Sequence, residues 1–350
     1  MADFLYPWQQ GWWQQWQQMR ASLPHAVLFH GPAGIGKTAF AERLAQSLLC
    51  EDALPDGQAC GKCVSCGWFA QYSHPDYRRI RPGAIDVAEA KEGDDADDGD
   101  ASDGGNEAVA KGARAGSKVI RIAQVRELAD FMNISTHRQG RRVVLLYPAD
   151  ALNAESSNAL LKTLEEPLPG TVMLLVADNL DGVLPTILSR CRKFPLPMPP
   201  RELSLEWLRE QGVGDAEEWL AEQGGAPLAA LAMAQAGRRD ELDEFLRQLV
   251  RPEVDGVLKT AERLQKTPVP ELIVWLQRWL YDIFSAKYSG RIRYYPRFAR
   301  EIEMLAARAD SGKLLRILKA TGARKAIADH PLAPRLFIED MLLDYLEFCS

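Results

Sequence analysis

The stretch Gly31-Pro32-Ala33-Gly34-Ile35-Gly36-Lys37-Thr38 decides the fold of this 350-residue chain. It matches the pattern G-x-x-x-x-G-K-[ST], in which glycines let backbone N–H groups close around phosphate. The apolar run 26–30 precedes it, and residues 37–49 follow with apolar side chains at helical spacing. This context predicts a nucleotide-binding loop in which Lys37 reaches the terminal phosphates and Thr38 holds Mg²⁺; the glycines that shape it are Gly31, Gly34 and Gly36. A loop of this shape that has lost its nucleotide is the alternative.

Strand and helix patterns alternate on the carboxyl side of this loop. Residues 143–147 and 171–177 are apolar runs, and residues 120–134 and 154–166 have helical periodicity. Alternation of this kind predicts a parallel sheet covered by helices on both faces. We therefore expect an α/β P-loop domain over residues 1–198.

Four prolines between residues 195 and 200 interrupt this pattern and are typical of a linker. Beyond them we find helical segments and no convincing strand. The chain is also long enough for roughly two or three domains. We expect a small helical lid over residues 199–239 and an all-helical domain over residues 240–350.

The stretch 82–117 is rich in Gly, Ala, Asp and Glu and has almost no large apolar residue. Such a composition cannot offset the entropy of ordering, so we predict a disordered surface insertion. Residues 86–107 alone carry a net charge of −9, whereas the whole chain carries −6. The remainder is near neutral at +3, which argues against a strongly basic DNA-binding protein.

Cysteines cluster directly after the helix that follows the phosphate loop. Cys50, Cys60, Cys63 and Cys66 have the spacing C-x9-C-x2-C-x2-C, which is typical of a tetrahedral Zn²⁺ site. With all four ligands supplied by cysteine, the site is expected to be structural rather than catalytic. Disulfides or unrelated free thiols are the alternatives.

The second apolar run ends in Tyr147-Pro148, where a P-loop ATPase needs an acidic residue to hold its metal. Neither side chain can bind Mg²⁺ or activate water at neutral pH, and the nearest acid, Asp150, lies two residues further on. The sequence thus favours a loop that binds ATP and Mg²⁺ at most, without hydrolysis by this chain alone.

The segments NALLKTLEEP (158–167) and LSRC (188–191) resemble the signature segments of AAA+ clamp-loader ATPases. With the phosphate loop, the cysteine insertion and the helical tail, they make the chain similar, over essentially its whole length, to the delta-prime family of bacterial DNA polymerase III subunits. The resemblance implies that the last domain is an oligomerisation collar. It also implies a hetero-pentamer with gamma/tau-type ATPase subunits and a delta subunit, which opens the sliding clamp and places it on primed DNA in replication.

Arg190 follows the apolar segment 183–188, which would anchor it, and its guanidinium is a planar donor fork suited to phosphate. The resemblance implies that Arg190 is an arginine finger acting in trans on ATP in a neighbouring subunit. The family's motor subunits carry Asp-Glu in place of Tyr147-Pro148 and an arginine in place of Leu228. These departures favour a non-hydrolysing stator, an accessory subunit of the polymerase holoenzyme. A surface arginine in an ordinary salt bridge is the alternative.

Two other functions fit parts of the sequence. Lys37 and Thr38 would suit an autonomous ATPase or P-loop phosphotransferase, which Tyr147-Pro148 opposes. The cysteine loop would suit a nucleic-acid contact, but between its cysteines it offers one base, Lys62, and no aromatic residue. Trp8, Trp12 and Trp16 stand four residues apart; base stacking could use such a row, but this spacing favours a helix face packed on the domain.

Composition places the chain among soluble globular proteins, with 47% hydrophobic and 26% charged residues. No apolar run approaches the roughly 18 residues that span a bilayer. The first seven residues lack the basic start and apolar stretch of a secretory signal. We therefore expect a cytoplasmic protein without a membrane partner.

Overall fold

The computed structural model describes residues 5–85, 117–133, 141–328 and 333–349. Most of the expected acidic insertion, residues 86–116, lies outside them. At its described ends, the N–H of Ala84 donates to the carbonyl of Ser117 at 3.0 Å. The chain forms two compact units, Met1–Met198 and Pro199–Ser350, which are described separately below. Within the described residues, no helix combines the length and apolar character that a membrane crossing needs.

The first unit is built on a five-stranded sheet in the order β2-β3-β4-β1-β5. All four neighbouring pairs are parallel. The inner strands β1, β3 and β4 are almost entirely apolar and buried because helices cover both faces. The strands are β1 (Ala26–His30), β2 (Tyr77–Ile80), β3 (Arg142–Leu146), β4 (Thr171–Ala177) and β5 (Arg192–Pro195). The predicted α/β class is thus confirmed.

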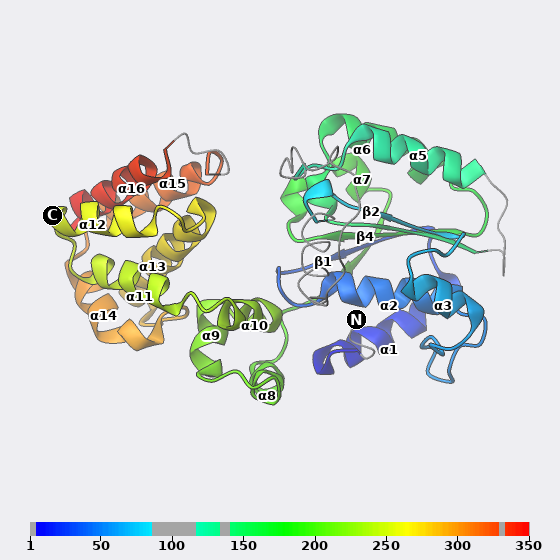
Figure 1. The fold of residues 1–350 in the computed structure, drawn as a ribbon, viewed down its shortest axis with the longest axis horizontal. Coiled ribbons are helices and arrows are strands. Elements are labelled where there is room, and N and C mark those ends of the chain that lie inside the picture. Colours follow the sequence, from blue (N-terminus) through cyan, green and yellow to red (C-terminus); the bar gives the residue numbers. More distant parts are fainter. Residues whose placement is uncertain (1–4, 86–116, 134–140, 329–332, 350) are drawn as a thin grey trace, which may run out of the picture. The chain divides into compact units, whose positions relative to one another are not determined.

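Helices lie on both faces of this sheet (Figure 1). One face carries α1 (Gln10–Met19), α2 (Lys37–Leu49) and α3 (Val64–Ala70). The opposite face carries α5 (Ile122–Asn133), α6 (Ala154–Glu165) and α7 (Pro185–Leu188), which share an apolar core with alternate strand residues. The phosphate loop connects β1 to α2, so the sheet and this helix hold both of its ends.

The tryptophan row packs on the domain, as its helical spacing predicted. Trp8, Trp12 and Trp16 are at most 5% exposed. Trp12 meets the ring of Phe40 edge-on at 5.6 Å, and Trp16 lies 5.9 Å from the ring of Phe29. These side chains fix α1 against α2 and β1, and their burial leaves no row for stacking bases.

Strands β2 and β5 escaped the sequence analysis because they are short edge strands with charged residues, such as Arg78 and Arg192. The proline-rich linker was also predicted to begin too early. Pro195 ends β5 opposite His30 of β1, where an edge position tolerates the missing N–H.

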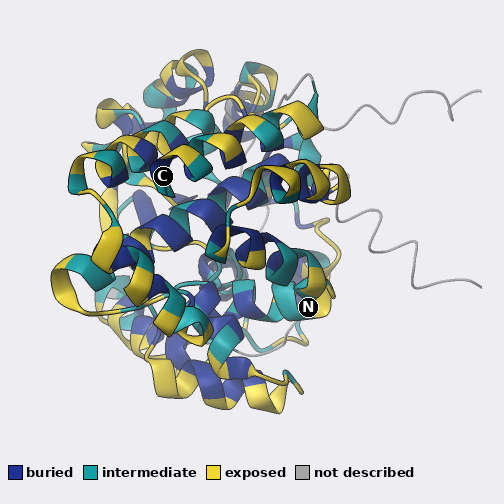
Figure 2. Cartoon of the chain, turned by 90° about the vertical axis from the view of Figure 1, so that its left-hand side faces the viewer, coloured by how far each residue is buried: buried dark blue, intermediate teal, exposed yellow. Residues whose placement is uncertain are grey.

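Within its described residues, the second unit contains helices and no strand. Its core surrounds α13, whose apolar residues Leu272, Leu276 and Trp279 are fully buried. Buried residues face inward and exposed ones outward on its helices (Figure 2). The helices are α8 (Arg201–Glu210), α9 (Ala216–Glu222), α10 (Pro227–Gln235), α11 (Arg239–Val250), α12 (Val254–Leu264), α13 (Val269–Ser289), α14 (Ala299–Arg308), α15 (Ser311–Arg324) and α16 (Pro334–Cys349). A division into lid and collar near residue 239 stays a prediction.

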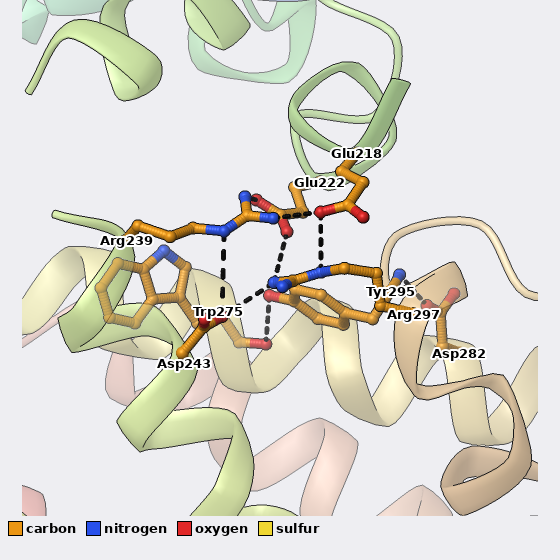
Figure 3. A network of polar contacts seen from close by, with 8 residues as sticks. All are labelled: Glu218, Glu222, Arg239, Asp243, Trp275, Asp282, Tyr295 and Arg297. Carbon is orange, nitrogen blue, oxygen red and sulfur yellow. Dashed lines mark hydrogen bonds and ion pairs between the residues drawn. The ribbon is translucent and has the colours of Figure 1, made fainter. Parts of the chain in front are cut away.

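An ion-pair network joins α9 to α11 and to the short 3-10 turn Pro296–Phe298 (Figure 3). Arg239 contacts Glu218 and lies 3.1 Å from Glu222, while Arg297 lies 3.0 Å from Glu218, 3.3 Å from Glu222 and 2.8 Å from Asp243. The side chain of Glu222 is only 3% exposed. Three carboxylates thus share two guanidinium groups, and one of the carboxylates is buried.

This network predicts pH-dependent stability that Glu222→Gln removes. Burial raises the pKa of Glu222 to about 7, against the lowering effect of the Arg239 and Arg297 guanidinium groups. An unfolded glutamate loses its proton near pH 4.3, whereas folded Glu222 keeps its proton up to about pH 7. The free energy of unfolding therefore falls progressively as pH rises through this range. We expect Glu222→Gln to stabilise the unit at pH 8 by up to about 3 kcal/mol, with a smaller gain at pH 5.5. Thermal unfolding at the two pH values measures this.

Glu217→Gln is the matched control, because Glu217 lies on the same helix with 60% of its side chain exposed. Its surface ion pairs are worth less than about 1 kcal/mol. A Glu222→Gln variant that is less stable than wild type at pH 8 would show that the ion pairs outweigh the burial of the carboxylate.

Candidate functional site

The glycines of the phosphate loop are required by backbone geometry. Gly34 and Gly36 have φ angles of 74° and 85°, in the left-handed region that side chains disfavour. Gly31 is required by space, since a Cβ there would lie 2.0 Å from the carbonyl oxygen of Leu196. The loop thus has the tight, glycine-dependent course that brings backbone N–H groups close to phosphate, and its residues fit a nucleotide polyphosphate.

Side chains of an N-terminal turn, which the sequence did not reveal, donate hydrogen bonds to the backbone of this loop. In η1 (Pro7–Gln9), the indole N–H of Trp8 donates to the carbonyl of Ile35, and the Gln9 amide donates to the carbonyl of Gly36, both at 2.9 Å. Gln9 is only 1% exposed. The buried tryptophan row was a signal for contact with the domain, but no pattern indicated that the contact falls on the phosphate loop.

Lys37 lies at the start of α2 beside a cavity of about 630 Å³. Its side chain is 3% exposed, and its ammonium donates to the carbonyl of Pro32 at 2.6 Å and pairs with the carboxylate of Asp178. The cavity is lined by Thr38, Glu42, Tyr72, Ile85, Tyr147, Pro148, Val176 and Asp178. The sequence placed Lys37 and Thr38 at this site but not the carboxylates of Glu42 and Asp178.

Tyr147 and Pro148 line the cavity at the end of β3, where an ATPase would place its acid. The Tyr147 hydroxyl accepts a hydrogen bond from Arg81 at 3.1 Å, and burial raises the pKa of Tyr147 to about 12. This hydroxyl therefore stays neutral at pH 7 and is a poor metal ligand. Asp150, the nearest acid in the sequence, accepts the backbone N–H of Asp178 at 3.3 Å.

The four clustered cysteines come together at the end of α2. All four sulfur atoms lie within 4.8 Å of one another, and those of Cys50 and Cys63 are 3.9 Å apart. Zinc–sulfur bonds of about 2.3 Å place tetrahedral ligands about 3.8 Å apart, so the cluster fits this ion. Backbone N–H groups of Lys62 and Cys63 lower the pKa of Cys60 to about 7, which favours its thiolate; burial raises that of Cys66.

A buried hydrogen-bond chain ties this cysteine module to α2. The Ser65 hydroxyl donates to the carbonyl of Leu49 at 2.6 Å and lies 2.6 Å from Nε2 of His74. Nδ1 of His74 accepts the N–H of Asp76 at 3.0 Å, so the proton belongs on Nε2, which donates to Ser65. Ser65 and His74 are each 1% exposed, so this serine–histidine pair supports structure and is closed to substrate.

Arg190 lies just after α7, where Ile187 is fully buried and Cys191 is 8% exposed. Its guanidinium donates to the carbonyl of Thr186 at 2.9 Å and pairs with Glu165 at the end of α6. The side chain is nevertheless 34% exposed. Among the described residues, the cavity beside Lys37 is lined by neither Arg190 nor the cysteines, so neither of them belongs to the phosphate-loop site.

A glycine-rich loop connects β1, an inner strand of a parallel sheet, to α2, which begins with the buried Lys37. This arrangement is that of a P-loop protein. A family model described as DNA polymerase III, delta subunit, matches residues 8–200, so the chain belongs to this DNA polymerase III family, in its delta' branch. The subunit delta' of Pseudomonas aeruginosa is 37% identical over 290 residues, covering 81% of this chain and 78% of the relative. That of Haemophilus influenzae is 29% identical and covers 98% and 96%, respectively.

The match extends to a second kind of subunit. The DNA polymerase III subunit gamma/tau of Mycobacterium tuberculosis is 34% identical over 182 residues, which cover 52% of this chain and 26% of the relative. The family predicted from the motifs is thereby confirmed.

Proposed function

We propose that this chain is the non-hydrolysing delta' subunit of a clamp loader. In this role it joins gamma/tau-type ATPase subunits and a delta subunit in a hetero-pentamer that places a sliding clamp on primed DNA. The observation that carries the proposal is Arg190, which follows the buried Val183 and Ile187 in a short segment and yet keeps 34% of its side chain exposed. The delta' and gamma/tau relatives support the same assignment.

Arg190 would act on ATP bound by the neighbouring subunit. A guanidinium stays charged and donates to two phosphate oxygens at once, which stabilises charge that develops during phosphoryl transfer. Arginine fingers supplied in trans contribute about 10³–10⁵ in rate. In this chain alone, the Arg190 guanidinium pairs with the Glu165 carboxylate. On docking against the neighbouring subunit, the guanidinium would leave Glu165 and bind the phosphate of the bound ATP.

The two other sites take supporting roles in this proposal. The four cysteines would hold a structural Zn²⁺, and the reducing cytoplasm, where we place the protein, would keep them as thiols. The phosphate loop would bind ATP with Mg²⁺ through Lys37 and Thr38, and bound Mg²⁺ would neutralise phosphate charge. The neutral Tyr147 supports binding without turnover.

An autonomous ATPase is the second candidate, favoured by one observation. Glu42 and Asp178 bring two carboxylates into the cavity beside Thr38, and either would suit a metal or a catalytic base. ATP turnover by the purified chain that disappears in Lys37→Ala would decide for it. A nucleic-acid contact by the cysteine loop has less support, since its one base, Lys62, stands without an aromatic neighbour in the loop.

Reconstitution tests the proposed role directly. We expect this chain to co-elute with gamma/tau and delta subunits, and we expect ATP turnover stimulated by clamp and primed DNA to depend on its presence. Size-exclusion chromatography and an ATPase assay with the chain included or omitted measure both effects. Full stimulated turnover without the chain, or failure to co-elute, would contradict the proposal.

A further inference from the structure

Lys37 of the phosphate loop forms an ion pair with Asp178. What we infer from this ion pair rests on the proposal that the loop binds nucleotide. The Lys37 side chain is 3% exposed, whereas that of Asp178 is 49% exposed and lines the cavity. A P-loop lysine contacts the terminal phosphates of a bound nucleotide through its ammonium. Here a carboxylate of the same chain contacts that ammonium.

Two contacts with Asp150 position the loop that carries Asp178. The backbone N–H of Asp178 donates to the Asp150 carboxylate at 3.3 Å, and a Cβ at Gly182 would lie 2.9 Å from the Cβ of Asp150. The loop after β4 therefore packs closely on η3 (Ala149–Ala151). This packing keeps the Asp178 carboxylate at the mouth of the cavity, in reach of Lys37.

The charge of the Asp178 carboxylate adds to this competition. The other carboxylate of the cavity lining, Glu42, is paired with Arg79 at 3.6 Å. A nucleoside triphosphate without metal carries several negative charges into the same space, and like charges at this range repel strongly where solvent is partly excluded. Magnesium bound to the phosphates removes much of that repulsion.

We propose that Asp178 competes with nucleotide phosphate for the Lys37 ammonium, so that the cavity selects a magnesium-complexed nucleoside triphosphate over the metal-free anion. Asp178 is thus a specificity-determining residue of the phosphate loop. It leaves Lys37 to the phosphates only when magnesium offsets the negative charge that the phosphates bring toward the Asp178 carboxylate.

Asp178→Asn tests this proposal in the full-length chain. The amide is isosteric and keeps the backbone N–H bond to Asp150, but it removes the charge that holds Lys37. With a fluorescent ATP analogue as the probe, we expect the dissociation constant in EDTA to fall about tenfold, and that in magnesium to fall less. The ratio of the two constants, which measures magnesium dependence, falls accordingly.

Asp181→Asn is the matched control, because Asp181 is an exposed residue of the same loop and its N–H bonds to Asn179. We expect it to leave both dissociation constants unchanged. Lys37→Ala combined with Asp178→Asn abolishes the gain if the probe binds at the phosphate loop.

Thermal unfolding gives a second readout that separates competition from a structural role. Without nucleotide, Asp178→Asn leaves the buried Lys37 ammonium without its counter-charge, although the Pro32 carbonyl still accepts from it, so the melting temperature falls. With the probe in EDTA, the variant gains more stability than wild type because it binds more tightly. A structural role alone would lower the melting temperature and add no affinity.

The proposal is overturned if Asp178→Asn binds the probe no more tightly than wild type in EDTA, which includes no binding at all, or if Asp181→Asn produces the same gain. Neither result touches the proposed clamp-loader role, which depends on co-elution and on stimulated turnover by the neighbouring subunit. A chain that assembles and stimulates turnover but binds no nucleotide would therefore refute this inference alone.

Discussion

Arg190→Ala is expected to slow the stimulated ATP turnover of the reconstituted complex by about a hundredfold or more. The substitution removes a guanidinium that contacts the Thr186 carbonyl and Glu165 at the surface, and it leaves the buried Ile187 in place. Since the lost group acts only when charge develops on phosphate, assembly should be nearly unchanged. The ATPase rate with saturating clamp and primed DNA, together with co-elution, measures the two effects.

Two companion variants sharpen this experiment. Arg190→Lys keeps the charge but loses the planar donor fork, so we expect an intermediate rate. Arg192→Ala removes an exposed arginine two residues further on, in edge strand β5, and should leave the rate unchanged. If Arg190→Ala turns over ATP at the wild-type rate in an assembled complex, Arg190 is a surface salt-bridge residue and the subunit serves only as scaffold.

Cys66→Ser is expected to release zinc and to open the module between Cys50 and Tyr77. Coupling of zinc binding to folding is worth about 10 kcal/mol in small zinc domains, so loss of one thiolate removes much of what orders this loop. We expect amide exchange in the module to accelerate by about a hundredfold or more, which corresponds to about 3 kcal/mol. Metal analysis and hydrogen exchange measure these effects.

Cys349→Ser is the control for this substitution, because Cys349 is a free cysteine in α16 outside the cluster. It should keep the zinc content and the exchange rates of wild type. The structural role of zinc fails as an explanation if purified wild-type protein carries no stoichiometric zinc, or if Cys66→Ser exchanges in the module as slowly as the control.

The inner strands were predictable because burial on two faces leaves an unambiguous apolar run. β1 and β4 have the predicted bounds, Ala26–His30 and Thr171–Ala177, since every residue on a doubly covered parallel strand tends to be apolar. β2 carries Arg78 and Arg79, and β5 carries Arg192 and Lys193. An edge strand is partly exposed, so its sequence does not differ from that of a polar loop.

The sequence alone determined the family, the parallel sheet, the phosphate loop and the set of four cysteines, because each follows from residue types at short, fixed spacing. The tertiary structure alone decided what those groups contact. Asp178 reaches Lys37, Gln9 holds Gly36, and His74 reaches Ser65 only after strands and helices bring distant segments together. A local pattern reports which side chains are present, whereas partner choice depends on the packing of the whole domain, and no spacing in the sequence records it.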